Sequence, residues 1–197
     1  MPTNDPNDPH NPNDPNDVNN PRINPREFDV GALFAALDER RRGEGLSWTG
    51  VANEIWQLSA VLNDKRHDHP IAPATLSGMP KRGNTSCQHA LFVLRWLGAA
   101  PEDFIAEPHP ATVGVPLPET DSAHRLRWSL AGLHTALDKA RTARGATWEQ
   151  AARRLSCTPS QLTGLRTAKF ATGMRLAMRI TQNLGKPAAD FVYISTW

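Results

Sequence analysis

The sequence predicts an all-helical protein built from two copies of one small helical unit. Three observations predict this fold class: a series of residues that recurs in the same order, two closely spaced helix-start signals in the second copy, and two proline-rich segments without helical periodicity. A length of 197 residues fits one or two small domains. We therefore expect a tail over residues 1–26, a first domain over 27–106, a linker over 107–122 and a second domain over 123–197.

The N-terminal tail consists largely of Asn-Asp-Pro units such as Asn4-Asp5-Pro6 and Asn7-Asp8-Pro9. Proline lacks a backbone donor, and asparagine and aspartate favour turns. The segment also has almost no apolar side chain that folding could bury. We expect residues 1–26 to be disordered and assign no metal to their carboxylates.

An internal duplication follows the tail. Ten residues between Leu33 and Ile55 recur one hundred positions later, and the register then shifts so that Leu76-Ser77-Gly78-Met79 matches Leu162-Thr163-Gly164-Leu165. So many matches in one order predict two copies of one fold, with about five helices each. The matched pairs are Leu33/Leu133, Ala36/Ala136, Leu37/Leu137, Asp38/Asp138, Arg41/Arg141, Gly45/Gly145, Ser47/Thr147, Trp48/Trp148, Ala52/Ala152, Ile55/Leu155, Ala90/Ala177, Leu97/Leu184, Gly98/Gly185, Asp103/Asp190, Phe104/Phe191 and Ile105/Val192.

The second copy contains two helix-start signals about ten residues apart. Thr147 with Gln150 forms a capping box, and Thr158 with Gln161 repeats it, with proline at the first helical position. Each signal opens a short segment with one apolar face. Residues 146–165 therefore predict a helix-turn-helix.

These residues resemble the Cro/C1 (XRE-like) class of regulators, which have the lambda-repressor-like fold. The resemblance runs from about Leu133 to Phe191 and rests on Ala152, on Pro159-Ser160-Gln161-Leu162-Thr163 and on Leu184-Gly185 followed by Ala189-Asp190-Phe191. The sequence departs from the class at Ser156, where relatives have a turn glycine, and at Trp148, where many have a phosphate-contacting glutamine. The resemblance implies that the third helix of the unit faces the major groove of DNA.

The first copy differs by about fourteen extra residues, which fall within an insertion over residues 56–71. Apolar residues from Val51 to Leu62 keep helical spacing, so we expect the second helix to continue to about Asn63 and residues 64–70 to form an exposed turn. Pro80 should end the third helix early. This copy is therefore predicted to be helical but a weaker DNA reader.

The linker over residues 107–122 contains four prolines and no helical periodicity. Its sixteen residues could reach about 50–60 Å when fully extended. That reach would span two half-sites one DNA turn apart, roughly 34–36 Å.

Charge is strongly segregated along the chain. The net charge of +2 hides a segment over residues 124–197 with 12 basic and 3 acidic side chains, a net charge of +9. Residues 27–107 instead carry a net charge of −3. This asymmetry indicates that the C-terminal part meets a polyanion.

The DNA-contacting candidates are polar or basic side chains on or beside the predicted recognition helices. Gln161 could pair with an adenine edge and Arg166 with guanine, although relatives often have a structural glutamate at the place of Arg166. The alternative is a solvated helix face with an ordinary cap, and for Trp148 a packing role is the favoured interpretation. The candidates are Thr147, Trp148, Arg153, Arg154, Ser160, Gln161, Thr163, Arg166 and Lys169 in the second copy, and Thr75, Ser77, Lys81 and Arg82 in the first.

Other chemistry has little support. Cys87 and Cys157 are too far apart in sequence for a paired motif, and His67-Asp68-His69 lacks further ligands for a metal. No catalytic motif is visible, so we expect neither an enzyme nor a cofactor. No apolar run is long enough to span a membrane and no signal region begins the chain, which predicts a cytoplasmic, nucleoid-associated protein.

The function predicted from these features is that of a sequence-specific regulator of transcription that binds double-stranded DNA, mainly through the third helix of the second domain. The alternative is an antitoxin-like or adaptor module that keeps the fold, with the first domain mediating dimerisation or binding a protein partner. RNA binding is a third interpretation, without an aromatic stacking surface beyond the two tryptophans.

Overall fold

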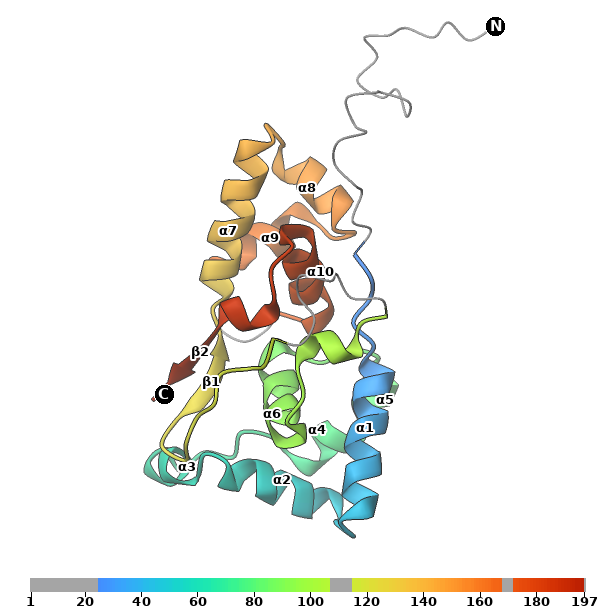
Figure 1. The fold of residues 1–197 in the computed structure, drawn as a ribbon, viewed down its shortest axis with the longest axis vertical. Helices are drawn as coiled ribbons and strands as arrows, with labels where there is room; N and C mark the ends of the chain where they lie inside the picture. Colours follow the sequence, from blue (N-terminus) through green and yellow to red (C-terminus); the bar gives the residue numbers. More distant parts are fainter. Residues whose placement is uncertain (1–24, 107–114, 168–171, 197) are drawn as a thin grey trace, which may run out of the picture.

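The computed structural model describes residues 25–106, 115–167 and 172–196, and the tail over 1–24 and Lys169 lie outside this range. Within it the fold is mostly helical with one two-stranded antiparallel sheet, so the helical class is confirmed and the sheet is an addition. Figure 1 shows two halves stacked along the long axis, with the C-terminal half above the N-terminal half.

The elements follow one another in a similar order in the two halves. In the N-terminal half they are α1 (Val30–Gly43), α2 (Trp48–Gln57), α3 (Ala60–Arg66), α4 (Pro73–Ser77), α5 (Met79–Arg82), α6 (Cys87–Leu97) and the 3-10 helix η2 (Pro101–Phe104). In the C-terminal half they are β1 (Arg125–Trp128), α7 (Leu130–Ala143), α8 (Trp148–Arg154), α9 (Pro159–Gly164), α10 (Met174–Leu184), the 3-10 helix η4 (Ala188–Phe191) and β2 (Val192–Ser195).

Both predicted capping boxes are confirmed. The backbone N–H of Thr147 donates to Oε1 of Gln150 at 2.8 Å, and that of Thr158 donates to Oε1 of Gln161 at 2.9 Å. The reciprocal bonds from each helix back to the threonine hydroxyl are also present. These two caps start α8 and α9 where the sequence predicted two helix starts.

The second helix of the N-terminal half is shorter than predicted. It ends at Gln57, and a separate helix, α3, begins at Ala60. The break has a tertiary cause, because the guanidinium of Arg95 binds the carbonyl of Leu58 and the hydroxyl of Ser59, which turns the chain out of the helix. The predicted early stop before Pro80 is confirmed, since α4 ends at Ser77.

An antiparallel bridge joins the two halves between Ser86 and Gly173, which immediately precede α6 and α10. The N–H of Cys87 donates to Thr172 at 2.9 Å, and the N–H of Met174 donates to Thr85 at 2.8 Å. The two bonds correspond to each other under the 87-residue offset between α6 and α10, because Cys87 matches Met174 and Thr85 matches Thr172. The local backbone at this junction therefore has approximate two-fold symmetry.

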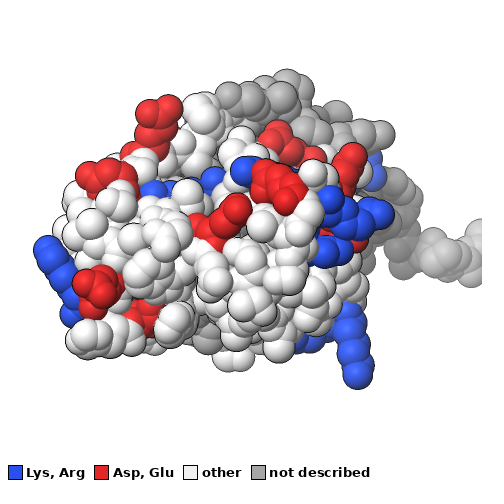
Figure 2. Space-filling view, turned by 90° about the horizontal axis from the view of Figure 1, so that it is seen from below, with Lys and Arg blue, Asp and Glu red and all other residues white. Residues whose placement is uncertain are grey.

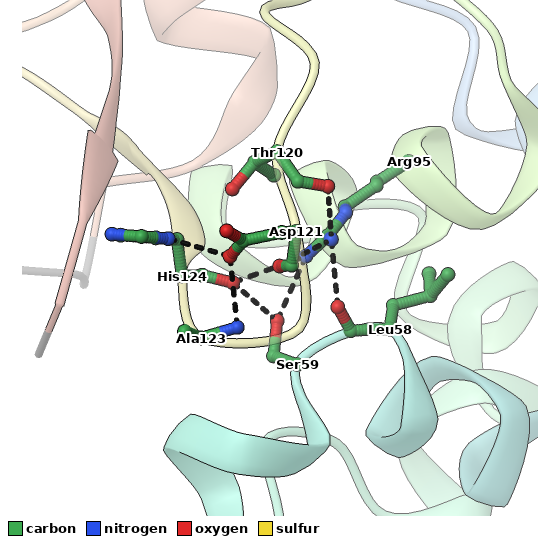
Figure 3. Close-up of polar contacts among 7 residues, drawn as sticks. All are labelled: Leu58, Ser59, Arg95, Thr120, Asp121, Ala123 and His124. Carbon is green, nitrogen blue, oxygen red and sulfur yellow. Dashed lines mark hydrogen bonds and ion pairs between the residues drawn. The ribbon is translucent and has the colours of Figure 1, made fainter.

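Each half also holds the segment that precedes the first helix of the other half. The amide of Gln182 in α10 accepts from and donates to the backbone of Arg26, at 2.8 and 2.9 Å. Arg95, at the matching position of α6, binds the carbonyls of Thr120, Asp121 and His124 at 2.9–3.3 Å (Figure 3). This exchange of segments fastens the halves together.

The inserted helix α3 completes this attachment. Asn63 of α3 and Asp68 just after it receive the guanidinium of Arg125 in β1, and the hydroxyl of Ser59 donates to the carbonyl of His124 at 2.7 Å (Figure 3). Trp56 of α2 also holds the segment that follows α3, because its indole N–H donates to the carbonyl of Asp68. Residues 115–122 have no helix or strand and lie along this surface instead of acting as a free spacer.

Candidate nucleic-acid interface

Helix α9 presents a polar face to solvent and anchors an apolar face in the core. Ser160, Gln161 and Thr163 are exposed, whereas Leu162 and Leu165 are 0 % and 1 % exposed. The exposed residues are three of the side chains that the sequence singled out. Arg166, one turn further, is exposed as well.

The turn between α8 and α9 contains no glycine. Residues 155–158 join α8 to α9, and Ser156 takes the left-handed conformation with φ of 50°. Arg179 of α10 donates to the carbonyl of Ser156 at 3.1 Å and so fixes the turn. Ser156 therefore stands where the regulators that the sequence resembles have a turn glycine, and its left-handed conformation costs about 1–2 kcal/mol in backbone strain.

The side chain of Gln161 already takes part in the cap of α9. Its Oε1 already accepts from the N–H and the hydroxyl of Thr158, at 2.9 and 3.3 Å. A paired hydrogen bond with adenine needs both Oε1 and Nε2 on the base. Gln161 must therefore release the cap before it can make the paired contact predicted from the sequence.

Helix α8 supplies the basic flank of this surface. Arg153 and Arg154 are exposed in its last turn, and Thr147 is exposed at its first. Trp148 is only half exposed, because its ring stacks on His134 at 5.2 Å and lies under the guanidinium of Arg141 at 4.7 Å. Trp48 makes the same contacts with Phe34 and Arg41 in the other half. These contacts support the packing interpretation of Trp148.

A cavity of about 360 Å³ beside α9 brings in residues that the sequence analysis missed. It is lined by Ser160 and Gln161 together with Arg175 and Arg179 of α10 and Asn84 of the N-terminal half. Arg175 and Arg179 also lie 3.7 and 3.6 Å from the carboxylate of Glu27. Their i, i+4 spacing places both on one helix face and was the available signal, whereas nothing local pointed to Asn84.

The matching surface of the N-terminal half is arranged differently. Lys81 and Ser77 are exposed, but Thr75 is half buried and its carbonyl receives the guanidinium of Arg82. This bond draws the basic side chain back onto α4. Of the four candidates of this half, Ser77, Lys81 and Arg82 are exposed, and Arg82 is held by the carbonyl of Thr75.

Two of the basic side chains of the C-terminal half are buried. Arg125 and Arg127 of β1 are 2 % and 6 % exposed, and burial together with the neighbouring Arg125 lowers the pKa of Arg127 to about 10. These two arginines are not available to a polyanion. Seen from below, at the end of the molecule formed by the N-terminal half, basic side chains lie in separate groups with acidic ones among them (Figure 2).

The comparisons with known proteins identify no relative, because no family model, curated protein or solved structure matches the chain. Within the described ranges, no helix is long and apolar enough to cross a membrane. No group of three metal-ligating side chains occurs among the same residues. Cys87 is buried, which raises the pKa of its thiol, and Cys157 is half buried.

Proposed function

We propose that the chain is a sequence-specific DNA-binding regulator of transcription composed of two tandem helix-turn-helix units of the lambda-repressor-like kind. The second unit reads the major groove with α9. We assign it no catalytic activity, cofactor or metal, and place its action in the cytoplasm, on the nucleoid.

The observation that carries the proposal is the pair of capped helices, α8 and α9, with the exposed polar face of α9 beside exposed arginines. Ser160, Gln161 and Thr163 present donors and acceptors of the kind that read base edges. Arg153 and Arg166 are exposed on either side and suit phosphate contacts. The tandem arrangement is supported by the equal lengths of α1 and α7, 14 residues each, and of α6 and α10, 11 residues each.

The test begins with selection of preferred sites from a random duplex library by the full chain. Full-length protein is required because the halves exchange segments at Arg95 and Gln182. Gln161→Glu is then the informative variant, since glutamate can still accept from Thr158 but has no amide donor. We expect it to lose about 1–3 kcal/mol of discrimination at one base position.

Thr163→Ser provides a matched control, because it keeps a hydroxyl on the same face and should leave that discrimination unchanged. If Gln161→Glu selects the same site with the same preference, α9 does not read bases through this residue. If the wild-type chain selects no site at all, the proposed function is wrong.

The alternative function is that of a protein-interaction module. It is favoured by three exposed apolar side chains near one corner, Val61 of α3 and Tyr193 and Ile194 of β2. Arg125 connects the two elements that carry these side chains. It lies in β1, which pairs with β2, and it contacts Asn63 of α3. Self-association that is lost in Ile194→Lys, without any DNA selection by the wild type, would support this alternative.

A further inference from the structure

A cavity of about 200 Å³ lies between α7, α8 and the end of α10, apart from the face of α9. Arg141, Arg144 and Arg154 line it together with the small side chains of Ala146 and Ala151. Asn183 of α10 closes it and is 6 % exposed. The wall therefore combines apolar surface, positive charge and one buried amide.

The buried amide of Asn183 is incompletely paired. Among the residues that the structure describes, none donates a hydrogen bond to its Oδ1, which is shielded from solvent. A buried acceptor without a donor is unfavourable, and such atoms are few in folded proteins. Replacing Asn183 is therefore expected to cost little, because its amide oxygen makes no hydrogen bond that the replacement would lose.

The N-terminal half shows what fills the corresponding place there. Asn183 corresponds to Trp96, because α10 begins 87 residues after α6. Trp96 is 4 % exposed, and its indole N–H donates to Glu54 of α2 at 2.7 Å. Glu54 itself corresponds to Arg154, which lines the cavity. An indole ring thus lies between α6 and α2 where the C-terminal half has open space between α10 and α8.

The other differences enlarge that space. Ala146 and Ala151 stand where the N-terminal half has Leu46 and Val51, both packed in its core. Gln150 is larger than its counterpart Gly50, but its amide is bound back to the N–H of Thr147. The cavity therefore arises from side chains that have become smaller on three sides.

The charge of the wall changes sign in the same comparison. Two glutamates of the N-terminal half are replaced by Arg144 and Arg154, while the Asp–Arg pair on the first helix is kept in both halves, at 2.7 and 2.6 Å. The four positions carry a net charge of −2 in the N-terminal half (Asp38, Arg41, Glu44 and Glu54) and +2 in the C-terminal half (Asp138, Arg141, Arg144 and Arg154).

From these observations we infer that the cavity binds a small aromatic carboxylate of about the size of indole. The ring occupies the place that Trp96 fills in the other half, beside Asn183, and the carboxylate lies against Arg144 and Arg154. This site does not depend on DNA binding. It is apart from the face of α9, and Arg154 is the residue that it shares with the basic flank of that surface.

The experiment is calorimetric titration of the full chain with indole-3-carboxylate at fixed ionic strength. We expect saturable binding, weaker by at least about tenfold for indole-3-carboxamide, which lacks the charge. Asn183→Trp should fill the cavity, abolish binding and leave thermal stability equal or higher. Lys139→Ala, an exposed charge on α7 that does not line the cavity, should leave binding unchanged.

If Asn183→Trp fails to fold, the double variant Ala146→Leu/Ala151→Val fills the cavity with the residues of the N-terminal half and should abolish binding as well. Saturation that persists in the filled variant overturns the assignment of the site. The absence of saturable binding to the wild type, or equal binding of the uncharged amide, overturns the proposed ligand class. Affinity for a random DNA duplex should be the same in the wild type and Asn183→Trp, because the filled cavity is not on the α9 face.

Discussion

The two halves of the molecule place similar helices in similar order, but they differ in the segment between the second helix and the one that would read DNA. In the C-terminal half residues 155–158 form a short turn, and α9 is left exposed beside arginines. In the N-terminal half residues 58–72 include α3, which is held by Arg125 of the opposite half. The inserted segment of the N-terminal half therefore contacts the opposite half of the molecule, whereas the short turn of the C-terminal half leaves α9 exposed to solvent.

Removing the contact between Arg125 and the segment around α3 should change stability most. Arg125→Ala removes a side chain that is 3 % exposed and that binds Asn63, which is fully buried, and Asp68, whose side chain is 39 % exposed. Because Asn63 loses its donor inside the protein, whereas Asp68 can be solvated, we expect a loss of about 1–3 kcal/mol in the free energy of unfolding, measured by urea denaturation. Arg153→Ala, at an exposed site, should stay within about 0.5 kcal/mol. A loss below about 1 kcal/mol for Arg125→Ala would show that this contact does not stabilise the fold.

A second contact between the halves makes stability depend on pH. Glu102 of η2 is 3 % exposed, accepts from the N–H of Ala188 at 2.7 Å, and has its other oxygen buried without a partner among the described residues. Burial raises the pKa of this carboxyl group, so the folded state binds its proton more tightly than the unfolded state. The contribution of Glu102 to stability is therefore full below the ordinary pKa and falls as the pH rises through the raised one.

Glu102→Gln keeps the acceptor for Ala188 and removes the titrating charge. We expect this variant to be more stable than the wild type at pH 7, by on the order of 1 kcal/mol, with the difference shrinking toward pH 4. Thermal unfolding at both pH values measures it. A difference that does not change with pH would mean that Glu102 does not titrate differently in the folded state.

A substitution in the turn between α8 and α9 should change stability least. Ser156→Gly relieves a left-handed φ of 50° in the C-terminal half. Since glycine also gains entropy in the unfolded chain, we expect a net stabilisation of about 0.5–1 kcal/mol. Ser160→Gly, at a helical position of α9, should destabilise by a similar amount. If both variants destabilise the protein, the conformation of Ser156 is not strained.

Much of this fold followed from local sequence signals. The capping boxes at Thr147 and Thr158, the exposed face of α9 and the stop before Pro80 are local properties of the chain, and the sequence predicted each of them. The early end of α2 and the sheet were missed, because they depend on Arg95 and on strand pairing between segments far apart in sequence. The burial of Arg125 and Arg127 was missed for the same reason, since net charge says nothing about which arginines remain in solvent.

We propose that DNA is bound by the C-terminal half and not by the N-terminal half. The most direct test of this proposal is fluorescence anisotropy of the full chain on a random duplex across a salt series, with matched charge reversals in the two halves. Arg153→Glu/Arg166→Glu should weaken binding by at least about tenfold and lower the salt slope by about two, whereas Lys81→Glu/Arg82→Glu should change affinity by less than about threefold. Equal losses in both variants, or the absence of salt-dependent binding by the wild type, would contradict the account.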